Sequence, residues 1–244
     1  MITAYLIARD TLDGTFPPNP AESLEAAYRR EIEYLDNLPG VSRNAKNQIG
    51  MSKPFWGGRE MHKLLRDFMR IERILKNANI LPPARILELG CGAGWLSELL
   101  ARMGYEVTGS TLDPSTVTLA KNRAAAFEHL AIKGKLQYRT AAMETLSKDI
   151  DDENEFDAVI IYEALHHVYD WRLALDETRK ILRSDGLLII ANEPNLIHTA
   201  KSYRVAKLTG TREIGLNRSR LADHLKTCGF HYVRFPHYLM TGGV

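Results

Sequence analysis

The stretch Arg85-Ile86-Leu87-Glu88-Leu89-Gly90-Cys91-Gly92-Ala93-Gly94-Trp95 decides the fold class of this chain of 244 residues. Its first half is a short apolar run typical of a buried strand, and its second half carries three glycines at alternate positions before an amphipathic stretch. Glycine lets the backbone turn tightly and approach a ligand closely, and a helix that begins there offers free N–H groups. The stretch therefore predicts a strand, a ligand-binding turn and a helix, in that order.

Short apolar runs alternate with amphipathic stretches after this turn, which predicts an α/β fold. Such alternation is typical of a doubly wound, mostly parallel sheet with helices on both faces. Ligands bind such sheets at the carboxyl ends of the strands. The expected strands cover residues 86–89, 106–109, 136–140, 156–162, 186–191 and 230–235, and the expected helices cover 95–103, 115–130, 170–182 and 219–228.

The first 80 residues have a different pattern. Apolar residues recur at helical spacing over residues 21–38 and 59–78, which predicts two helices. We therefore expect an N-terminal helical lid or extension over residues 1–80 and a ligand-binding domain over residues 81–244. The last expected strand, 230–235, needs a partner, and three explanations remain open. The final strand is short, the chain is a fragment, or residues 2–7 supply an edge strand.

Composition and charge exclude several classes of protein. Apolar residues make up 45% and charged residues 25%, which is ordinary for a globular protein and excludes collagen-like and wholly disordered chains. Two cysteines imply no disulfide framework, and neither a membrane span nor a signal peptide is evident, so we expect a cytoplasmic protein. The net charge of +2 hides a basic stretch over residues 198–244. This stretch is either a solvated face or a site that attracts an anionic partner.

The turn and three later segments resemble one protein family. Glu88 to Gly94 has the spacing G-x-G-x-G and resembles motif I of the class I S-adenosylmethionine-dependent methyltransferases. The dinucleotide fingerprint G-x-G-x-x-G is not met, because Trp95 stands where its third glycine would fall. Three further segments resemble the later motifs of the same family: Phe156–Ile160, Glu163–Val168 and Leu182–Ile190. The resemblance therefore covers about residues 80–235. The resemblance implies a Rossmann-like fold, S-adenosylmethionine as the cofactor and S-adenosylhomocysteine as the product.

The resemblance also assigns residues to the cofactor. It implies that the backbone of Gly90 to Gly94 lies against the methionine part, that Glu88 braces the loop, and that Cys91 is a small filler rather than a nucleophile. The full expected set is Glu88, Gly90, Cys91, Gly92, Gly94, Thr111, Leu112, Asp113, Ala142, Met143, Glu144 and Tyr162.

Two positions depart from the family pattern. Thr111 stands where family members have an acid that binds the ribose, and Ala142 stands where they often have an acid that contacts adenine. Asp113 could replace the first acid, or it could instead cap a helix that starts at Pro114. The Met143 N–H and side chain could still contact the adenine, and Glu144 could be a favourable charge on a first helical turn. Losing two polar contacts would weaken cofactor binding, which keeps a non-catalytic relative open as an alternative.

Candidate catalytic residues follow the strand 156–162. Methyl transfer is a direct displacement, and a hydroxyl acceptor benefits from a base. His166 and His167 lie where the acceptor should approach; we favour His167 as the base. Glu163 could contact the methionine amine or the acceptor. The Asn/Asp-Pro-Pro-Tyr/Phe signature of amino-group methyltransferases is absent at residues 161–164, which favours an oxygen or carbon acceptor.

The acceptor site should come from the variable segments. We expect an insertion at about residues 195–217 to contribute basic and aromatic groups that suit a phosphate- or carboxylate-bearing acceptor. Trp56 and Arg59 of the N-terminal region, beside the mobile joint Gly57-Gly58, could complete it. The expected acceptor residues are Trp56, Arg59, His198, Tyr203 and Arg204. No metal site is expected.

Together these features predict a methyltransferase that transfers the methyl group of S-adenosylmethionine to a small polar acceptor, preferably to oxygen. The alternatives are a non-catalytic binding or regulatory protein with the same fold and, because of the basic stretch, a nucleic-acid methyltransferase. The basic stretch carries no added nucleic-acid module and few interleaved aromatic residues, so we expect no nucleic-acid partner. We expect no membrane partner either, and the oligomeric state stays open.

Overall fold

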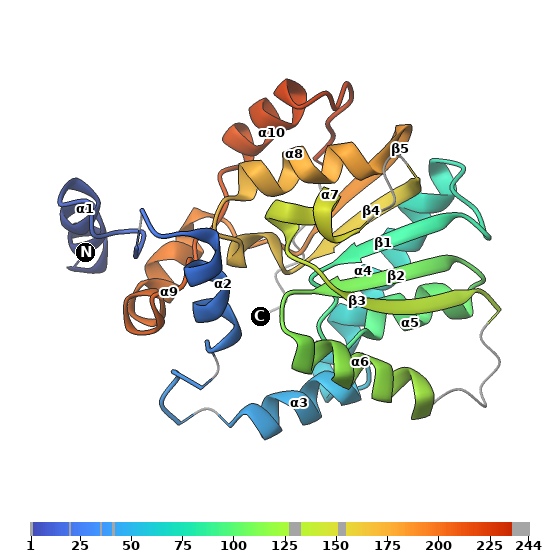
Figure 1. The fold of residues 1–244 in the computed structure, drawn as a ribbon, viewed down its shortest axis with the longest axis horizontal. Coiled ribbons are helices and arrows are strands. Elements are labelled where there is room, and N and C mark those ends of the chain that lie inside the picture. The colour runs from blue at the N-terminus through green and yellow to red at the C-terminus, as the bar shows by residue number, and fades with distance from the viewer. Residues whose placement is uncertain are drawn as a thin grey trace.

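A computed structural model describes residues 2–19, 21–34, 36–40, 42–126, 133–150 and 155–235. Its centre is a five-stranded sheet in the order β3-β2-β1-β4-β5, in which every neighbouring pair is parallel (Figure 1). The strands are β1 (Arg85–Leu89), β2 (Glu106–Thr111), β3 (Lys135–Thr140), β4 (Phe156–Tyr162) and β5 (Leu182–Ala191). The predicted α/β fold with a doubly wound parallel sheet and N-terminal helices is confirmed.

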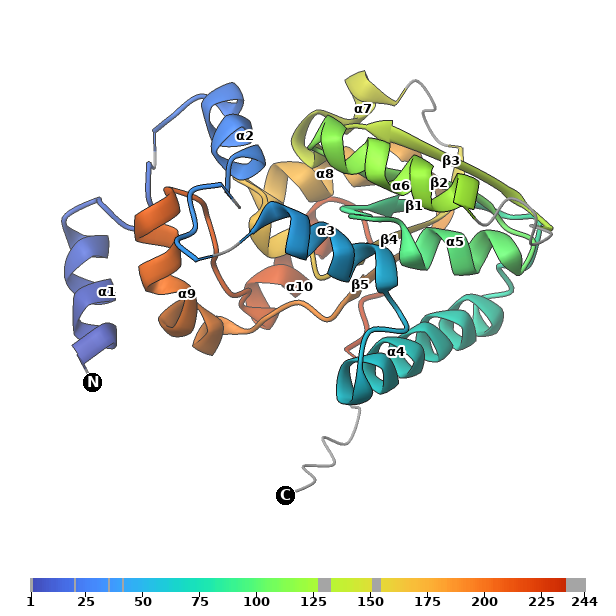
Figure 2. The same ribbon diagram turned by 90° about the horizontal axis from the view of Figure 1, so that it is seen from below.

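Helices cover both faces of the sheet (Figures 1 and 2). On one face lie α4 (Gly58–Asn77), α5 (Trp95–Arg102) and α6 (Pro114–Ala126), and on the other lie α7 (Leu146–Asp149), α8 (Trp171–Ile181) and α10 (Arg218–Thr227). Short 3₁₀ turns, η1 (Met143–Thr145) and η2 (Leu165–His167), follow β3 and β4. Because both faces are covered, the central strands β1 and β4 are apolar almost throughout.

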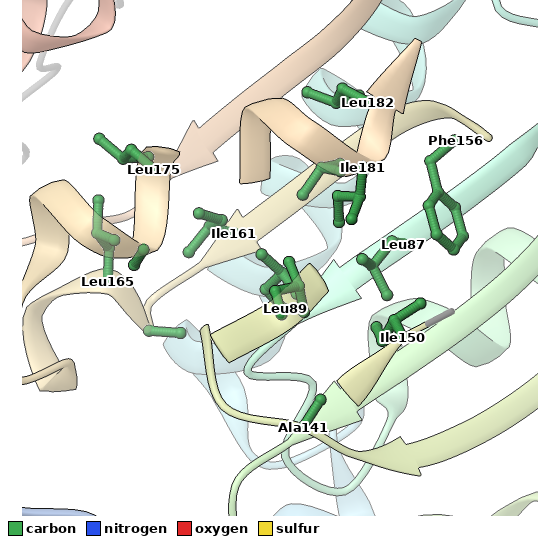
Figure 3. Close-up of a cluster of buried hydrophobic side chains, with 14 of the residues drawn as sticks. Leu87, Leu89, Ala141, Ile150, Phe156, Ile161, Leu165, Leu175, Ile181 and Leu182 are labelled. Atoms are coloured by element: carbon green, nitrogen blue, oxygen red, sulfur yellow. The ribbon is translucent and has the colours of Figure 1, made fainter. Parts of the chain in front are cut away.

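The central strand β1 connects the two cores. Successive side chains of a strand point to opposite faces, so Leu87 and Leu89 enter the core under α7, α8 and α10, whereas Ile86 enters the core under α4 and α5. Figure 3 shows Leu87 and Leu89 among the side chains of the first core, with Ile161 and Ile181 nearby. All four side chains are almost completely buried. The rigid ends of β1 and β4 therefore carry the loops that form the candidate site.

The N-terminal residues form helices that reach beyond the sheet. They are α1 (Ile2–Leu12), α2 (Leu24–Ile32) and α3 (Arg43–Ser52), followed by α4. Helix α1 packs on α9 (Leu196–Thr209), and both views place this pair away from the sheet (Figures 1 and 2). The buried carboxylate of Asp10 holds the two helices together, because Tyr203 Oη donates to it at 2.6 Å and Lys207 Nζ lies 3.0 Å away.

Three sequence-based expectations about elements need correction. Residues 230–235 form no strand, because Phe230 and Val233 bury their side chains against the core under α8 without pairing to β5. Residues 2–7 lie in helix α1 and are not an edge strand. The helix expected over 21–38 is only α2, which ends at Ile32, and the residues after it form turns. The end of the helix expected over 115–130 lies outside the described residues.

Candidate active site

A pocket opens at the carboxyl ends of the first four strands of the sheet, where doubly wound sheets bind ligands. It encloses about 870 Å³ of space free of atoms, part of it open to solvent, which is in the range of ligand sites. Its walls come from the loops after β1, β2, β3 and β4, from α2, and from the segment after α9. The lining residues are Glu22, Ala27, Tyr28, Glu31, Gly90, Gly92, Thr111, Leu112, Ala141, Ala142, Met143, Glu144, Glu163, Ala164, His167, Val168, Tyr169, Gly210, Thr211 and Arg212.

The three glycines of the turn after β1 have different tasks. Gly90, Gly92 and Gly94 all adopt positive φ, at 73°, 53° and 79°, which side chains rarely tolerate. A Cβ at Gly90 would collide with Ala164, and one at Gly94 would collide with the ring of Tyr138, so these two glycines are required by the protein's own packing. A Cβ at Gly92 would meet no protein atom within 4 Å. Gly92 lines the pocket, so its missing side chain leaves the backbone open to a ligand.

Glu88 and Cys91 are buried beneath the surface of the turn and do not line the pocket. The buried carboxylate of Glu88 accepts a hydrogen bond from Ser97 Oγ, which joins the end of β1 to α5. Burial raises the pKa of Glu88 to about 7, against the opposing effect of Ser97. Burial likewise raises the pKa of the Cys91 thiol, so the thiol is protonated at neutral pH. The structure thus places Cys91 as a buried side chain in the turn.

At the end of β2 the pocket is lined by Thr111 and Leu112, and Asp113 has other partners. The Asp113 carboxylate caps α6, accepting from Ser115 N at 2.8 Å and from Thr116 Oγ1 at 3.0 Å, and it also accepts from Arg43 Nη1 of α3 at 3.1 Å. The helix starts at Pro114, as the capping alternative requires. Asp113 therefore organises the protein at this point and does not reach the pocket.

Beyond β3, Ala142 and Met143 line the pocket and Glu144 connects three segments. The Ala142 N–H donates to Asp149 Oδ2 at 3.1 Å. Glu144 Oε1 accepts from Tyr169 N at 2.8 Å, and Tyr28 Oη of α2 lies 3.4 Å from Glu144 Oε2. Burial raises the pKa of the Glu144 carboxyl. Glu144 thus ties the loop before α8, and α2, to the rim of the pocket.

After β4 the chain turns sharply at Glu163. Glu163 is exposed, lines the pocket and has φ +53°, an uncommon conformation for a residue with a side chain. Its neighbour Tyr162 points away from the pocket, because its hydroxyl donates to Asp67 Oδ2 of α4 at 3.0 Å and its ring packs edge-on against Trp95. The structure therefore keeps Tyr162 out of the pocket lining, as it does Glu88, Cys91 and Asp113.

Glu193 organises the histidine turn, and sequence reasoning gave it no such role. Its carboxylate accepts from the backbone N–H groups of Ala164, Leu165 and His166 at 2.7, 2.9 and 3.1 Å. It also accepts from His166 Nδ1 at 2.8 Å. An acid directly after β5, next in the sheet to β4, was the only signal in the sequence for this role. Because Glu193 holds it, His166 is buried and does not line the pocket.

His167 does line the pocket, and carboxylates surround it. Its Nδ1 lies 3.1 Å from Glu31 Oε1 of α2 and 3.5 Å from Glu213 Oε1. Burial lowers the pKa of His167, but Glu31, Glu213 and Glu193 outweigh that effect and raise the pKa to about 9. The imidazole and the Glu31 carboxylate therefore lie at ion-pair distance on the pocket wall, and Nδ1 of His167 is buried without a well-aligned hydrogen bond to any described residue.

The segment after α9 supplies the remaining wall. The guanidinium of Arg212 lies 4.0 Å from the centre of the Tyr169 ring, and both residues line the pocket. Arg212 Nε is buried and has no hydrogen-bond partner among the described residues. A buried donor without a partner costs free energy unless a ligand or water supplies one.

The structure brings none of the five expected acceptor residues to the pocket lining. Trp56 and Arg59 are exposed at the start of α4, and Arg204 is exposed on α9. Tyr203 bonds to Asp10, as described above. His198 points toward Glu213, with Nε2 3.4 Å from Glu213 Oε2. The reason is that α9 forms a regular helix, which turns most of the insertion toward α1 or outward.

The pocket fits S-adenosylmethionine at several points. The open backbone of Gly92 suits the methionine part, the end of β2 suits the ribose, and Met143 suits a flat apolar ring. At the two pocket positions where the family pattern has an acidic residue, at the end of β2 and after β3, this chain has Thr111 and Ala142. The residues present therefore fit the cofactor, with fewer polar contacts to the nucleoside.

Known proteins resemble this chain in sequence and in fold. Residues 87–190 match the family model described as "Methyltransferase domain". A protein named "Ubiquinone biosynthesis O-methyltransferase" from Bradyrhizobium diazoefficiens is 35% identical over 138 residues, which are 56% of this chain and 49% of that protein. One of the same name from Pelagibacter ubique is 30% identical over 63% of this chain and 64% of its own length. The chain thus spans half to about two thirds of these relatives.

Solved structures show the same fold at lower identity. The YcgJ protein of Bacillus subtilis superposes with a TM-score of 0.54 at 17% identity, covering 65% of this chain and 66% of its own. An arsenic(III) S-adenosylmethionine methyltransferase from Chlamydomonas reinhardtii superposes with a TM-score of 0.52 at 20% identity, covering 62% and 52%. In the described part of the chain, no helix is long and apolar enough to cross a membrane. From its strand order, glycine turn and matching family model, the segment of residues 87–190 is a methyltransferase domain of the class I S-adenosylmethionine-dependent type.

Proposed function

We propose that this chain transfers the methyl group of S-adenosylmethionine to an oxygen atom of a small acceptor. The observation that carries the proposal is one pocket that joins the glycine turn after β1 to the His167–Glu31 pair. The names of the relatives support an oxygen acceptor, because they describe O-methyltransferases. The sequence between Ile161 and Ala164 lacks an amino-group methyltransferase signature, which disfavours an amine and is compatible with an oxygen or a carbon acceptor.

The cofactor end comprises the loops after β1, β2 and β3. Gly90 and Gly92 would take the methionine part, Thr111 and Leu112 the ribose, and Met143 the adenine. When bound, the cofactor supplies an electrophilic methyl group on a sulfonium for in-line displacement. The chain's own contribution at this end is orientation, which alone can supply much of the rate enhancement of a displacement.

The acid–base work falls to the His167–Glu31 pair. A hydroxyl is a poor nucleophile while it is protonated, so a group on the pocket wall has to take its proton as the new bond forms. His167 and Glu31 both line the pocket, and 3.1 Å separates Nδ1 from Oε1. We assign to this pair the proton that leaves the acceptor hydroxyl. Because the pKa of His167 is about 9, the pair acts as a base only in the fraction of molecules that has lost the imidazolium proton, so kcat should rise with pH toward 9. Glu163, exposed in the same pocket, would contact the methionine amine or the acceptor.

The acceptor wall favours a small, flat molecule that carries an oxygen acceptor for hydrogen bonds. Arg212 lies over the Tyr169 ring and holds a buried Nε without a partner among the described residues. A carbonyl or anionic oxygen of the substrate would satisfy that donor. The ring of Tyr28 from α2 and the ring of Tyr169 offer flat apolar surface nearby.

A lid role follows for the N-terminal region. Tyr28 reaches Glu144 at the adenine end, and Glu31 reaches His167 at the acceptor end, so α2 lies along the pocket. We propose that residues 1–80 act as the extension that covers the site, and that residues 81–244 act as the cofactor domain. Within the first 80 residues, α2 supplies the covering contacts.

The basic C-terminal stretch supports a small molecule over a nucleic acid. Four of its eight basic residues contact other groups of the protein. Lys207 lies 3.0 Å from Asp10, and Arg212 stacks on Tyr169. Arg218 and Arg234 lie over the rings of Phe235 and Tyr232. Both cysteines are free, which fits the reducing cytoplasm in which we place the protein.

Calorimetry with S-adenosylmethionine and S-adenosylhomocysteine tests the cofactor step. We expect binding in the micromolar range, and absence of heat at millimolar ligand would refute the proposal in favour of a non-catalytic relative. A panel of small phenols and hydroxy acids, followed by release of S-adenosylhomocysteine, then tests the acceptor. Turnover with amines and with no hydroxyl compound would overturn the choice of oxygen.

A further inference from the structure

We propose that His166, His198 and Glu213 bind a divalent transition-metal ion of the zinc type at a site beside the pocket but outside its lining. The three residues come from the turn after β4, from α9 and from the segment that follows α9. They are far apart in sequence and show no metal-ligand spacing, so sequence reading did not find them. None of the three side chains lines the pocket, although Glu213 also lies 3.5 Å from His167 Nδ1.

The donor atoms are close enough to share an ion. One ligand atom from each of the three residues lies within 4.8 Å of the other two. His198 Nε2 lies 3.4 Å from Glu213 Oε2. Two ligands at about 2.0–2.2 Å from a zinc ion in tetrahedral geometry are roughly 3.4 Å apart, so this pair has the separation of two ligands of one ion. Small movements of side chains would bring the third ligand to the same distance.

The chemistry around His166 points to a ligand as well. Glu193 accepts from His166 Nδ1 at 2.8 Å and from three backbone N–H groups. Because Nδ1 of His166 faces Glu193, Nε2 is the ring nitrogen of His166 that is left to bind a metal ion. Carboxylate partners of this kind orient histidine ligands and strengthen them in metal sites.

Charge gives a third reason. The side chains of Glu193 and Glu213 are 8% and 7% exposed, and they meet two imidazoles in this cluster. The His167 imidazolium, 3.5 Å from Glu213, supplies one positive charge against the three carboxylates of Glu31, Glu193 and Glu213. A bound dication would neutralise the remaining negative charge. Two imidazoles and one carboxylate are the donor set that zinc, and the first-row metals near it, prefer.

A bound ion would have a definite effect on the pocket. It would tie the turn that carries His167 to α9 and to the segment that carries Arg212, and both of these residues line the pocket. Three protein ligands leave at least one coordination position for water or another oxygen. The ion would therefore hold the acceptor wall in place.

A second group in the described part of the chain serves as the control. Asp176, His224 and Cys228 also lie within ligand distance of one another, between α8 and α10. His224 Nε2 already lies 3.0 Å from Asp176 Oδ1 and 3.1 Å from the carbonyl oxygen of Arg172, and all three side chains are partly exposed. This group contains a sulfur ligand, whereas the proposed site contains none.

The test uses the full chain, treated with a chelator, dialysed and titrated with ZnCl₂ in the absence of S-adenosylmethionine. We expect one zinc ion per chain, with affinity at least tenfold weaker in both His198→Ala and Glu213→Gln and unchanged in His224→Ala. His198 is partly exposed, so its variant should fold, and circular dichroism would verify this for all three. The Co²⁺-loaded protein should show ligand-field bands without the charge-transfer band of a thiolate.

Three outcomes would overturn the proposal. The first is that the folded protein does not bind zinc stoichiometrically. The second is that the wild type and both ligand variants bind zinc with equal affinity. The third is a thiolate charge-transfer band of the Co²⁺-loaded protein that disappears in His224→Ala. Cofactor binding is measured separately by calorimetry on the metal-free protein. Failure of the metal site and failure of the proposed methyl transfer are therefore distinguishable.

Discussion

The two ends of the pocket are built in opposite ways. The cofactor end rests on a run of neighbouring residues, Gly90 to Gly94, held by the rigid end of β1. The acceptor end is assembled from α2, the histidine turn and the segment after α9, and Glu31, His167 and Arg212 meet there only after folding. The comparison teaches that the family's shared chemistry lies in a local motif, whereas specificity depends on long-range packing.

The largest effect should follow from filling the cofactor end. Gly92→Val places a branched side chain in the pocket at φ +53°, so we expect no measurable binding of S-adenosylmethionine at millimolar concentration. Gly14→Val is the matched control, because Gly14 has φ +66°, open surroundings and no place in the pocket lining. Calorimetry on both variants gives the answer. Equal affinity in Gly92→Val and wild type would refute the assignment of the glycine turn.

The next effect should appear at the acceptor end. His167→Ala should lower kcat by about 10²–10⁴-fold, the usual contribution of a general acid–base group, and leave the cofactor Kd within about threefold. Glu31→Gln should also lower kcat. If the two side chains act as one pair, the double variant loses little more than His167→Ala alone. Full activity of His167→Ala, or strictly additive losses, would contradict the paired role.

A smaller effect should distinguish Arg212 from its neighbours on the basic stretch. Arg212→Ala removes a buried donor above Tyr169 and should raise the acceptor KM about 10- to 100-fold, which corresponds to roughly 1–3 kcal/mol. Arg204→Ala is the control, since Arg204 is exposed on α9 outside the pocket. Steady-state kinetics with an identified acceptor would show the split. Equal effects of the two substitutions would mean that the charge acts from a distance and not by contact.

The smallest effect concerns stability at the cofactor end. The pKa of Glu88 is about 7 in the folded protein, above its ordinary value of about 4.5, so the folded state binds a proton that the unfolded state releases between these values. The free energy of unfolding should therefore fall by roughly 1–2 kcal/mol between pH 5.5 and 7.5 through this group. Urea denaturation of wild type and Glu88→Gln at both pH values measures it. A pH dependence that is identical in the two proteins would show that Glu88 does not titrate in this range.

Much of the fold could be predicted from the sequence, because the patterns that indicate strands and helices are local. The apolar runs of β1 and β4 and the helical spacing of α4 and α8 repeat within a few residues, and their elements were predicted nearly to their bounds. The strand expected at 230–235 was wrong, since an alternating pattern there does not reveal whether a neighbouring strand is available. Helix α9 was missed because its apolar and polar residues do not separate into two faces.

The candidate site divides in the same way. A position at or shortly after the carboxyl end of a strand made it possible to predict the pocket residues Gly90, Gly92, Thr111, Met143 and His167. Their partners could not be predicted, because a carboxylate's role depends on what folding brings near it. Glu193 under the histidine turn, Glu31 beside His167 and Glu213 beside His198 are all of this kind.

The sequence by itself therefore determined the strand–turn–helix unit, the parallel sheet and the place that we propose for the cofactor, because those depend on periodicity and on glycine's backbone freedom. Only the tertiary structure decided that Asp113 caps α6, that Tyr203 bonds to Asp10 and that Arg212 faces the pocket. Each of these side chains had more than one possible partner, and the packing of distant helices selected one of them.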